Sequence, residues 1–459
     1  TEFGKTYDFK SIKNLKDFRE CIPLSSYEDL EPHIVKMRTG KQNILWPTKV
    51  KWFAKSSGTT DSKSKYIPIS KESIYQCHYK AGKDLLSIYC NKYSVKNIFD
   101  GKSVMLGGSH SISEHSNKMK EGDLSAIIME HLPFWVQIQQ SPTKKIALMD
   151  EWEKKLELMA TQAIHENVSS LSGVPSWTLV FAQKVLEKTG KKNLHEVWPN
   201  FELYMHGGIN FEPYKKQFEK LFPKGINYLE SYNASEGFFG IQDNPNRNDM
   251  LLMLDYGIYY EFIPIKHSFQ KKPKTIKLQE VKLAEDYELV ISTNAGLWRY
   301  RIGDTIQFTN KEPYRIIITG RTKHYLNAFG EELMIHNAEK ALQQVCKDTN
   351  TEVVDFTAAP KHQSNTKKAY HEWVIEFKEE PKDLANFTYR FDAALKSGNS
   401  DYEAKRYKNL ILEMPLVHNA RKGLFFEWLK NKGKLGGQNK VPRLRNDRKI
   451  IEEILKLNE

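Results

Sequence analysis

The chain of 459 residues has few cysteines and no long apolar segment. Cys21, Cys77, Cys90 and Cys346 form no CxxC pair and no periodic framework, so we expect free thiols in a reducing compartment. The longest apolar runs, such as the one at 250–254, fall far short of the roughly 20 residues that cross a bilayer. The first residues show no export signal. We therefore expect a soluble, cytoplasmic protein without a membrane partner.

No excess of one charge sign dominates the chain. Lys plus Arg total 69 and Asp plus Glu total 57, a formal net charge of +12. The lysines are scattered and no nucleic-acid-binding motif is found, so we expect no nucleic-acid partner. The charge does suit a polyphosphate substrate. Hydrophobic residues make up 40% of the chain, which excludes a disordered protein. We expect a monomer by default.

Strand and helix signals alternate, which indicates a layered α/β fold. The spacing of apolar residues predicts helices at 71–92, 150–166 and 175–189. It predicts strands at 286–292, 297–302 and 314–319. In the second helix an apolar stripe repeats at three and four residues, and we interpret it as core; it consists of Trp152, Leu156, Met159 and Ala163.

The pattern changes after about Arg321. A helix at 332–346, strands near 352–358 and 371–377, and helices at 381–397 and 447–457 indicate a compact α+β unit. We expect a large N-terminal domain over 1–321, a small mobile C-terminal domain over 325–459, and a hinge near 321–324. The segment 430–446 is rich in Gly and Lys, which predicts a mobile surface loop.

Two common catalytic motifs are missing. A Walker A loop is absent, because Lys96 stands where the leading glycine of the GxxxxGK[ST] pattern should precede Gly101 and Lys102. A nucleophile elbow is also disfavoured, because GxSxG requires glycine at the position of Asn233, two residues before Ser235. Neither a P-loop nor a serine hydrolase is indicated.

Three polar groups remain as candidates for chemistry. Four hydroxyls and a glycine at 56–60 suit a phosphate-binding loop, although an ordinary polar loop has the same composition. Glu236 follows an apolar strand signal. A carboxylate there could bind Mg²⁺, although a glutamate in an ordinary surface turn has the same pattern. Asp304 suits the two hydroxyls of a ribose and Arg321 suits phosphate, although each also suits a structural ion pair.

The order of these groups matches a known family. The motifs that match are TEFGK, IPLSSYEDL, LWPTKVKWFAKSSGTTDSKSKYIPIS, YNASEGFFGIQ, YELVISTNAGLWRYRIGDTIQF, GRTKHYLNAFGEEL and GKLGGQNKVPRLRNDR. Across essentially its whole length the chain resembles the Gretchen Hagen acyl-acid amido synthetases of plants and their bacterial relatives, within the acyl-adenylate-forming superfamily. It is more similar to the bacterial members because it is shorter than the plant enzymes. The resemblance implies a large N-terminal domain of mixed sheets flanked by helices and a small C-terminal α+β domain.

The resemblance also implies a two-step ligase reaction. ATP and Mg²⁺ convert a small carboxylic acid to an acyl-adenylate, and the amine of an amino acid then displaces AMP. In this sequence the implied phosphate loop is Ser56, Ser57, Gly58, Thr59 and Thr60. The other implied nucleotide-binding residues are Gly207 and Gly208 at the adenine, Tyr232 stacked near it, Ser235, Asp304 at the ribose and Arg321. Glu236 is the implied metal ligand, and Lys440 and Arg321 are the implied catalytic residues, with Lys440 carried by the C-terminal domain to the α-phosphate.

The acyl pocket is less evident in the sequence. Phe238, Phe239 and Trp135 are candidates for its apolar wall, although buried core aromatics, also the alternative for Trp177, fit the same pattern. Two alternatives to an amido synthetase stay open. One is an acyl-CoA ligase that uses the same adenylate step, and the other is a non-catalytic basic binding protein on the same fold.

Overall fold

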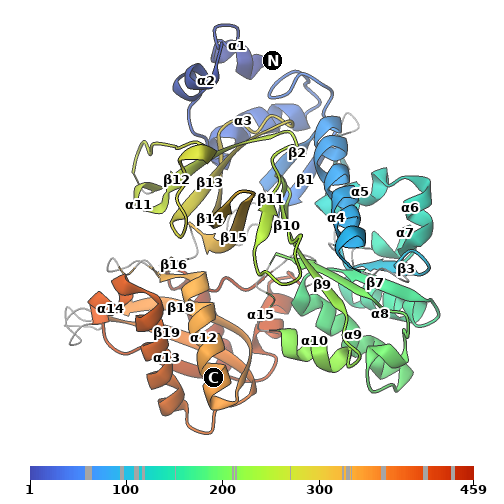
Figure 1. The fold of residues 1–459 in the computed structure, drawn as a ribbon, viewed down its shortest axis with the longest axis vertical. Helices are drawn as coiled ribbons and strands as arrows, with labels where there is room; N and C mark the ends of the chain where they lie inside the picture. Colours follow the sequence, from blue (N-terminus) through green and yellow to red (C-terminus); the bar gives the residue numbers. More distant parts are fainter. Residues whose placement is uncertain are drawn as a thin grey trace.

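The computed structural model of this protein is a mixed α/β molecule (Figure 1). It describes residues 1–56, 65–93, 98–107, 113–115, 119–149, 151–208, 211, 214–268, 270–322, 325–326, 331, 333–362, 369–406, 412–435 and 440–459. Residues 1–322 are called the N-terminal part and residues 333–459 the C-terminal part. In Figure 1 the C-terminal part, in orange and red, lies below the sheets of the N-terminal part.

A large sheet organises the N-terminal part. Within the described residues it has eleven strands, in the order β12-β13-β14-β15-β11-β10-β9-β8-β7-β3-β6. One half is parallel and comprises β3 (Lys102–Met105), β6 (Gln140–Ser141), β7 (Val168–Ser172), β8 (Leu203–Gly207) and β9 (Asn227–Ala234). The other half is antiparallel and comprises β10 (Gly237–Ile241), β11 (Met250–Leu252), β12 (Ile258–Pro264), β13 (Asp286–Thr293), β14 (Tyr300–Lys311) and β15 (Tyr314–Arg321). The pairing changes from parallel to antiparallel at β9.

A smaller sheet and several helices complete the N-terminal part. The small sheet has the order β2-β1-β5-β4 and consists of β1 (Trp52–Ser56), β2 (Lys65–Ile69), β4 (Ser113–His115) and β5 (Met119–Gly122). The helices are α1 (Glu2–Thr6), α2 (Leu15–Cys21), α3 (Tyr27–Arg38), α4 (Tyr79–Lys92, continuing a π turn at Ser73–His78), α5 (Leu124–His131), α6 (Phe134–Gln139), α7 (Lys144–Ala147), α8 (Trp152–Ala163), α9 (Pro175–Thr189), α10 (Lys215–Leu221) and α11 (Ile265–Ser268). Short 3₁₀ turns lie at Leu194–Glu196 and Leu278–Glu280. Among the described helices, none is long and apolar enough to cross a membrane.

Local sequence signals account for α8 and α9. Trp152 and Met159 are 6% and 1% exposed, so the predicted apolar stripe of α8 is part of the core. Pro175 occupies the first turn of α9, where its missing N–H costs no hydrogen bond. Gly190 ends α9 in the left-handed conformation, at a φ of 66°.

The C-terminal part is an α+β unit. Its main sheet has the order β18-β19-β20, and a two-stranded pair, β16 (Tyr325–Leu326) with β17 (Leu333–Met334), precedes it. The elements are α12 (Ile335–Thr349), β18 (Glu352–His362), β19 (Ala369–Glu379), α13 (Leu384–Gly398), α14 (Ser400–Arg406), β20 (Leu416–Ala420), α15 (Leu424–Asn431) and α16 (Lys449–Asn458). The helices and strands predicted after residue 321 are therefore present.

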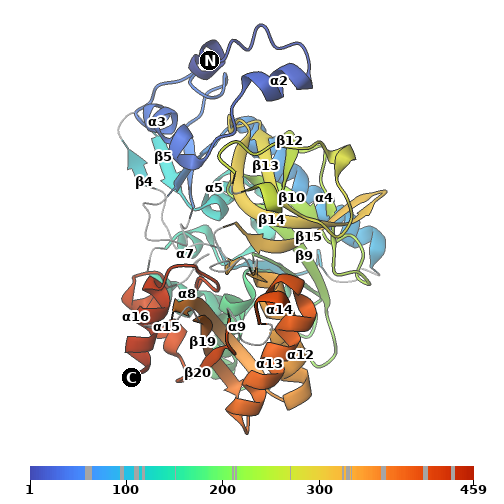
Figure 2. The same ribbon diagram turned by 90° about the vertical axis from the view of Figure 1, so that its left-hand side faces the viewer.

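The buried apolar side chains of the two parts are partly continuous. One cluster joins α8 and α9 to α15 and α16, and includes Phe181, Leu424 and Ile451. Figure 2 shows α15 and α16 beside α8 and α9. The rings of Trp177 on α9 and Phe426 on α15 lie 6.5 Å apart. The two parts therefore share a core in this arrangement.

The prediction of a surface loop over 430–446 is wrong at both of its ends. The helix α15 extends to Asn431, and residues 441–444 are buried, with Leu444 fully so. The nitrogen of Ala358 on β18 donates to the carbonyl of Arg443 at 2.7 Å, and the nitrogen of Arg445 donates to the carbonyl of Ala358 at 3.0 Å. These bonds fix the segment against the edge of β18, which its Gly and Lys content did not indicate. Residues 436–439 lie outside the described part.

Candidate active site

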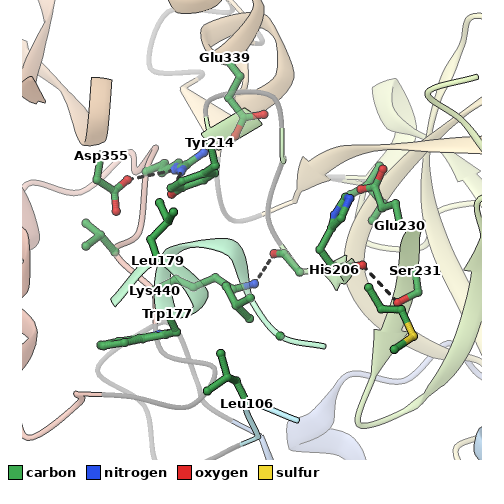
Figure 3. A pocket seen from close by; sticks show the side chains of 18 of the residues that line it. Leu106, Trp177, Leu179, His206, Tyr214, Glu230, Ser231, Glu339, Asp355 and Lys440 are labelled. Carbon is green, nitrogen blue, oxygen red and sulfur yellow. Dashed lines mark hydrogen bonds and ion pairs between the residues drawn. The ribbon is translucent and has the colours of Figure 1, made fainter. Parts of the chain in front are cut away.

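A cavity of about 1620 Å³ lies between the two parts. Residues from both parts line it, and Figure 3 shows how some of them face one another. The carboxyl ends of β7, β8 and β9 open into it, with Gly173, Gly208 and Glu236 among the lining residues. Ligands of α/β sheets usually bind at the carboxyl ends of parallel strands. The sheet topology therefore places the cavity where a ligand site is expected.

Two glycines occupy the end of β8. A side chain at Gly207 would place its Cβ 2.3 Å from the carbonyl oxygen of Ser231 on β9, so only glycine fits between these strands. Gly208 has a φ of 81°, and a Cβ there would lie 2.9 Å from Nζ of Lys440. The backbone at this turn is consequently exposed to the cavity and to Lys440.

Tyr232, Asp304 and Arg321 form one polar group. The hydroxyl of Tyr232 donates to Oδ2 of Asp304 at 2.6 Å, and Nε of Arg321 lies 2.8 Å from Oδ1. Strand pairing explains this proximity, because Asp304 on β14 stands opposite Arg321 on β15. Burial raises the pKa of Tyr232 well above its ordinary value, and Asp304 raises it further. Asp304 raises the pKa of Arg321, which keeps the guanidinium charged.

Glu236 stands in the turn between β9 and β10, where Ala234 pairs with Gly237. Its side chain is half-buried and lines the cavity. Burial raises the pKa of Glu236, and the nearby Asp304 carboxylate raises it further. Within the described part of the chain, no three His, Cys, Asp or Glu side chains gather as a ligand set for a metal ion.

Lys440 reaches the cavity from the C-terminal part. Its ammonium group donates to the carbonyl oxygen of Gly208, and Figure 3 marks this contact. Loss of water, together with the nearby Arg321 guanidinium, lowers the pKa of Lys440 to about 7. His206 also lines the cavity, and burial lowers its pKa to about 3, so its imidazole is neutral at physiological pH.

Some predicted site residues lie outside the described residues. These are Ser57, Gly58, Thr59 and Thr60 of the expected phosphate loop. The backbone of Ser56 ends β1 and that of Trp135 belongs to α6, but their side chains are outside the described part. Ser235 lines the cavity beside Glu236.

Phe238 and Phe239, the aromatic residues predicted for the acyl wall, lie in the core. They are 6% and 0% exposed, and both belong to a buried apolar cluster rather than to the cavity lining. Phe239 lies against the ring of Tyr232 at 4.8 Å, and Phe238 against that of Tyr256 at 6.2 Å. The physical reason is that every residue of β10 is buried, because the strand is central in the sheet.

The apolar lining of the cavity comes from elsewhere. Leu106 follows β3, Leu156 lies on α8 and Trp177 on α9. The sequence pattern predicts Leu156 to be core and leaves a core position open for Trp177. Periodicity finds a buried helix face but does not indicate where that face borders a cavity. Sequence patterns did not indicate four further lining residues: Arg443, Glu339 and Asp355 from the C-terminal part, and Tyr214 from the N-terminal part.

Two carboxylates, two cations and a glycine turn thus surround one cavity between the two parts of the α/β fold. The sequence matches three domains of one family: the GH3 family N-terminal domain over residues 1–226, the central domain over 251–321 and the C-terminal domain over 336–449. The chain belongs to this family, the Gretchen Hagen 3 family. The family predicted from the sequence motifs is confirmed.

Relatives with known names support the same assignment. The chain is 25% identical to the jasmonoyl–L-amino acid synthetase JAR4 of Nicotiana attenuata, over 78% of this chain and 73% of the relative. It is 23% identical to the indole-3-acetic acid-amido synthetase GH3.3 of Arabidopsis thaliana, over 98% of this chain and 88% of the relative.

Solved structures show the same fold. The acyl acid amido synthetase AtGH3.15 in complex with 2,4-DB matches with a TM-score of 0.81 at 17% identity, covering 100% of this chain and 90% of that one. A 2-hydroxyisobutyryl-CoA ligase in the postadenylation state matches with a TM-score of 0.56 at 12% identity, covering 98% and 86%. The predicted fold class, a mixed α/β molecule with a large N-terminal and a smaller C-terminal part, is confirmed.

Proposed function

We propose that this protein is an ATP-dependent acyl-acid amido synthetase, a ligase that adenylates a carboxylic acid and transfers the acyl group to the amine of an amino acid. One observation carries the proposal: Gly208, Asp304 and Lys440, distant in sequence and drawn from both parts, line a single cavity. The relatives are named as a jasmonoyl–L-amino acid synthetase and an indole-3-acetic acid-amido synthetase, which supports this enzyme class.

In the proposed first step a carboxylate oxygen of the acid attacks the α-phosphorus of ATP, and the bond to pyrophosphate breaks. Negative charge moves onto the α-phosphate and the leaving group, so fixed cations are the useful catalysts. We assign that role to Lys440 and Arg321. Asp304, whose carboxylate lies in the cavity between Tyr232 and Arg321, is assigned to the ribose hydroxyls.

The remaining nucleotide contacts are assigned to neighbours of this group. All of them line the cavity: we assign Gly207 and Gly208 to the adenine, Tyr232 to a position near it, and Ser235 to the phosphates. The loop from Ser56 to Thr60 is assigned to the β- and γ-phosphates.

Glu236 fits a magnesium ion shared with the phosphates. Mg²⁺ is commonly bound through one or two carboxylates, with phosphate oxygens and waters completing the coordination. A bound cation would offset the burial and the Asp304 charge that together raise the pKa of Glu236. When bound, the ion supplies positive charge to the phosphate oxygens.

In the second step the amine nitrogen attacks the acyl carbon, the bond to AMP breaks and the amine loses a proton. We assign the acyl group to the apolar side of the cavity at Leu106, Leu156 and Trp177. We further propose that 1–321 and 325–459 act as domains, with a hinge near 321–324 that lets the smaller one rotate between the two steps. A cytoplasmic location and a monomer without nucleic-acid partners stay predictions.

Acid-dependent exchange of labelled pyrophosphate into ATP tests the adenylation step. We expect exchange with at least one aliphatic, aromatic or indole acid in the presence of Mg²⁺. No exchange with any of these acids would contradict the proposal.

The nature of the acceptor needs a separate measurement, because a CoA ligase shares the fold. Mass spectrometry of products formed with mixed amino acids and CoA distinguishes the two. An amide product is expected, and a thioester as the sole product would replace the proposed function by CoA ligation.

A further inference from the structure

The segment that carries Lys440 is attached to the edge of β18. The hydroxyl of Thr357 donates to the carbonyl of Pro442 at 2.7 Å. Leu444 stands opposite Ala358 in a parallel bridge, and Val441 is 5% exposed. The backbone after Lys440 therefore belongs to the C-terminal part, while the Lys440 ammonium reaches Gly208 in the N-terminal part.

The side chain of Arg443 ties this segment to its surroundings. Arg443 is 7% exposed and forms ion pairs with Glu339 on α12 and, at 3.3 Å, with Asp355 on β18. Its guanidinium carbon lies 4.9 Å from the ring centre of Phe356. One of its nitrogens also donates to the hydroxyl of Tyr214 at 3.4 Å, just before α10 in the N-terminal part. Figure 3 shows Tyr214, Glu339 and Asp355 gathered on one side of the cavity, near Lys440.

Arg443 has more partners than a simple ion pair would require. The planar guanidinium presents several donors in fixed directions, so it binds two carboxylates and a hydroxyl at once. A lysine ammonium on a flexible stem cannot hold the same three partners in one plane. Because only Val441 and Pro442 separate Arg443 from Lys440, fixing the guanidinium also fixes where the Lys440 backbone starts.

We propose that Arg443 is a positioning residue for adenylation: it holds the segment 440–445 so that the Lys440 ammonium is presented inside the cavity, with Tyr214 as its contact on the N-terminal part. This inference rests on the proposed function. A misplacement of about 1 Å in a catalytic group costs up to about 100-fold in rate.

Arg443→Lys keeps a positive charge and removes the fixed fork. We expect kcat for pyrophosphate exchange to fall by about 20-fold or more, with KM for ATP within about threefold of the wild type. Amide formation from a supplied acyl-adenylate, which does not require the α-phosphate contact, is expected to stay within about threefold. An equal loss in both half-reactions, or no loss of exchange, would overturn the proposal.

Arg406→Lys is the matched control. Arg406 is 8% exposed and pairs with Asp392 through two bonds of 2.7 Å, within the C-terminal part and outside the cavity lining. Arg406→Lys also removes a buried guanidinium that binds a carboxylate through two nitrogens. We therefore expect a loss of thermal stability similar to that of Arg443→Lys, with pyrophosphate exchange at the wild-type rate. If Arg443→Lys does not fold, Tyr214→Phe takes its place: a loss of about threefold or more in exchange alone supports the proposal, and unchanged exchange overturns it.

A third measurement does not depend on activity. Peptide-resolved acetylation at about pH 10.5, where most lysines are substantially deprotonated, compares Lys440 with the exposed Lys449. We expect at least fivefold faster labelling of Lys440 in Arg443→Lys and no change in Arg406→Lys. If the wild type shows this protection but no exchange, the proposed function fails and the positioning stands. Equal labelling of Lys440 in the wild type and Arg443→Lys overturns the positioning.

Discussion

The loss of water around single residues in the cavity shifts the pKa values of their side chains. Glu236 and Asp304 are two carboxylates, and Arg321 and Lys440 two cations, within one space. Burial shifts the pKa of Glu236 upward and that of Lys440 downward, so each side chain is pushed toward its neutral form. Such opposed shifts are common at functional sites, because a charged ligand restores the ionised forms.

Glu236→Gln tests the metal assignment and also has a consequence for stability. We expect pyrophosphate exchange to fall by about 100-fold, because the proposed Mg²⁺ ligand is lost. The raised pKa means that the folded protein holds this proton more tightly than the unfolded chain. Ionised Glu236 therefore destabilises the fold above the ordinary pKa of about 4.5 that the unfolded chain has.

Without ligands at pH 7, the same variant is expected to melt at the wild-type temperature or roughly 1–2 °C above it. Scanning calorimetry and a magnesium titration of exchange provide the two measurements. The exposed Glu20→Gln serves as control and should change neither. Unchanged exchange in Glu236→Gln would remove the metal assignment.

Lys440 gives a prediction about pH. With a pKa of about 7 in the free enzyme, the ammonium loses its charge as the pH rises through 7. If that charge assists adenylation, kcat/KM for ATP in the exchange assay falls above about pH 7. Lys440→Arg keeps the charge at all accessible pH values, so its profile should lack this decrease. The same decrease in both proteins would show that another group titrates.

At the scale of elements, the turn after β8 brings backbone and lysine together. Gly208→Ala introduces a Cβ at a φ of 81° and 2.9 Å from Nζ of Lys440. Gly225→Ala is the matched control, with a φ of 78° and no atom within 4 Å of its Cβ. Both substitutions should cost about 1 kcal/mol or more in free energy of unfolding, since alanine is strained at positive φ.

Only Gly208→Ala is expected to impair adenylation, by about tenfold or more in exchange rate, because only that methyl displaces Lys440. Urea unfolding and pyrophosphate exchange measure the two effects. Equal exchange rates in the two variants would argue against a functional contact between Lys440 and the β8 turn.

At the scale of the whole molecule, the shared apolar cluster couples the two parts. Leu424 on α15 is fully buried in the cluster that includes α8 and α9. Leu424→Ala should cost about 2–5 kcal/mol, and because the cluster is shared, calorimetry should show one transition moved to lower temperature. The exposed Leu15→Ala, at 52% exposure, should have little effect. Two resolved transitions in the wild type would show that the parts unfold independently.

Sequence periodicity and motif order predicted much of this molecule. The helices over 152–163 and 175–189, the strands predicted at 286–292 and 314–319, and the α+β unit after residue 321 are present because local apolar patterns carry their own signal. The strand predicted at 297–302 instead begins at Tyr300 and continues to Lys311. The family is confirmed because long motifs in a fixed order are specific. The site at Gly208, Asp304 and Arg321 was predicted for the same reason, and its individual roles stay proposals.

The tertiary structure alone decided which side chains border the cavity. Phe238 and Phe239 follow the acidic motif directly, but the central position of β10 buries them, whereas Trp177 from a distant helix lines the space. Val441 to Leu444 are buried although their composition indicated a loop, because β18 offers an unpaired edge. Local patterns encode which face of an element is apolar. Which partner covers that face, and where a gap remains, depends on contacts between residues hundreds of positions apart, as between Lys440 and Gly208.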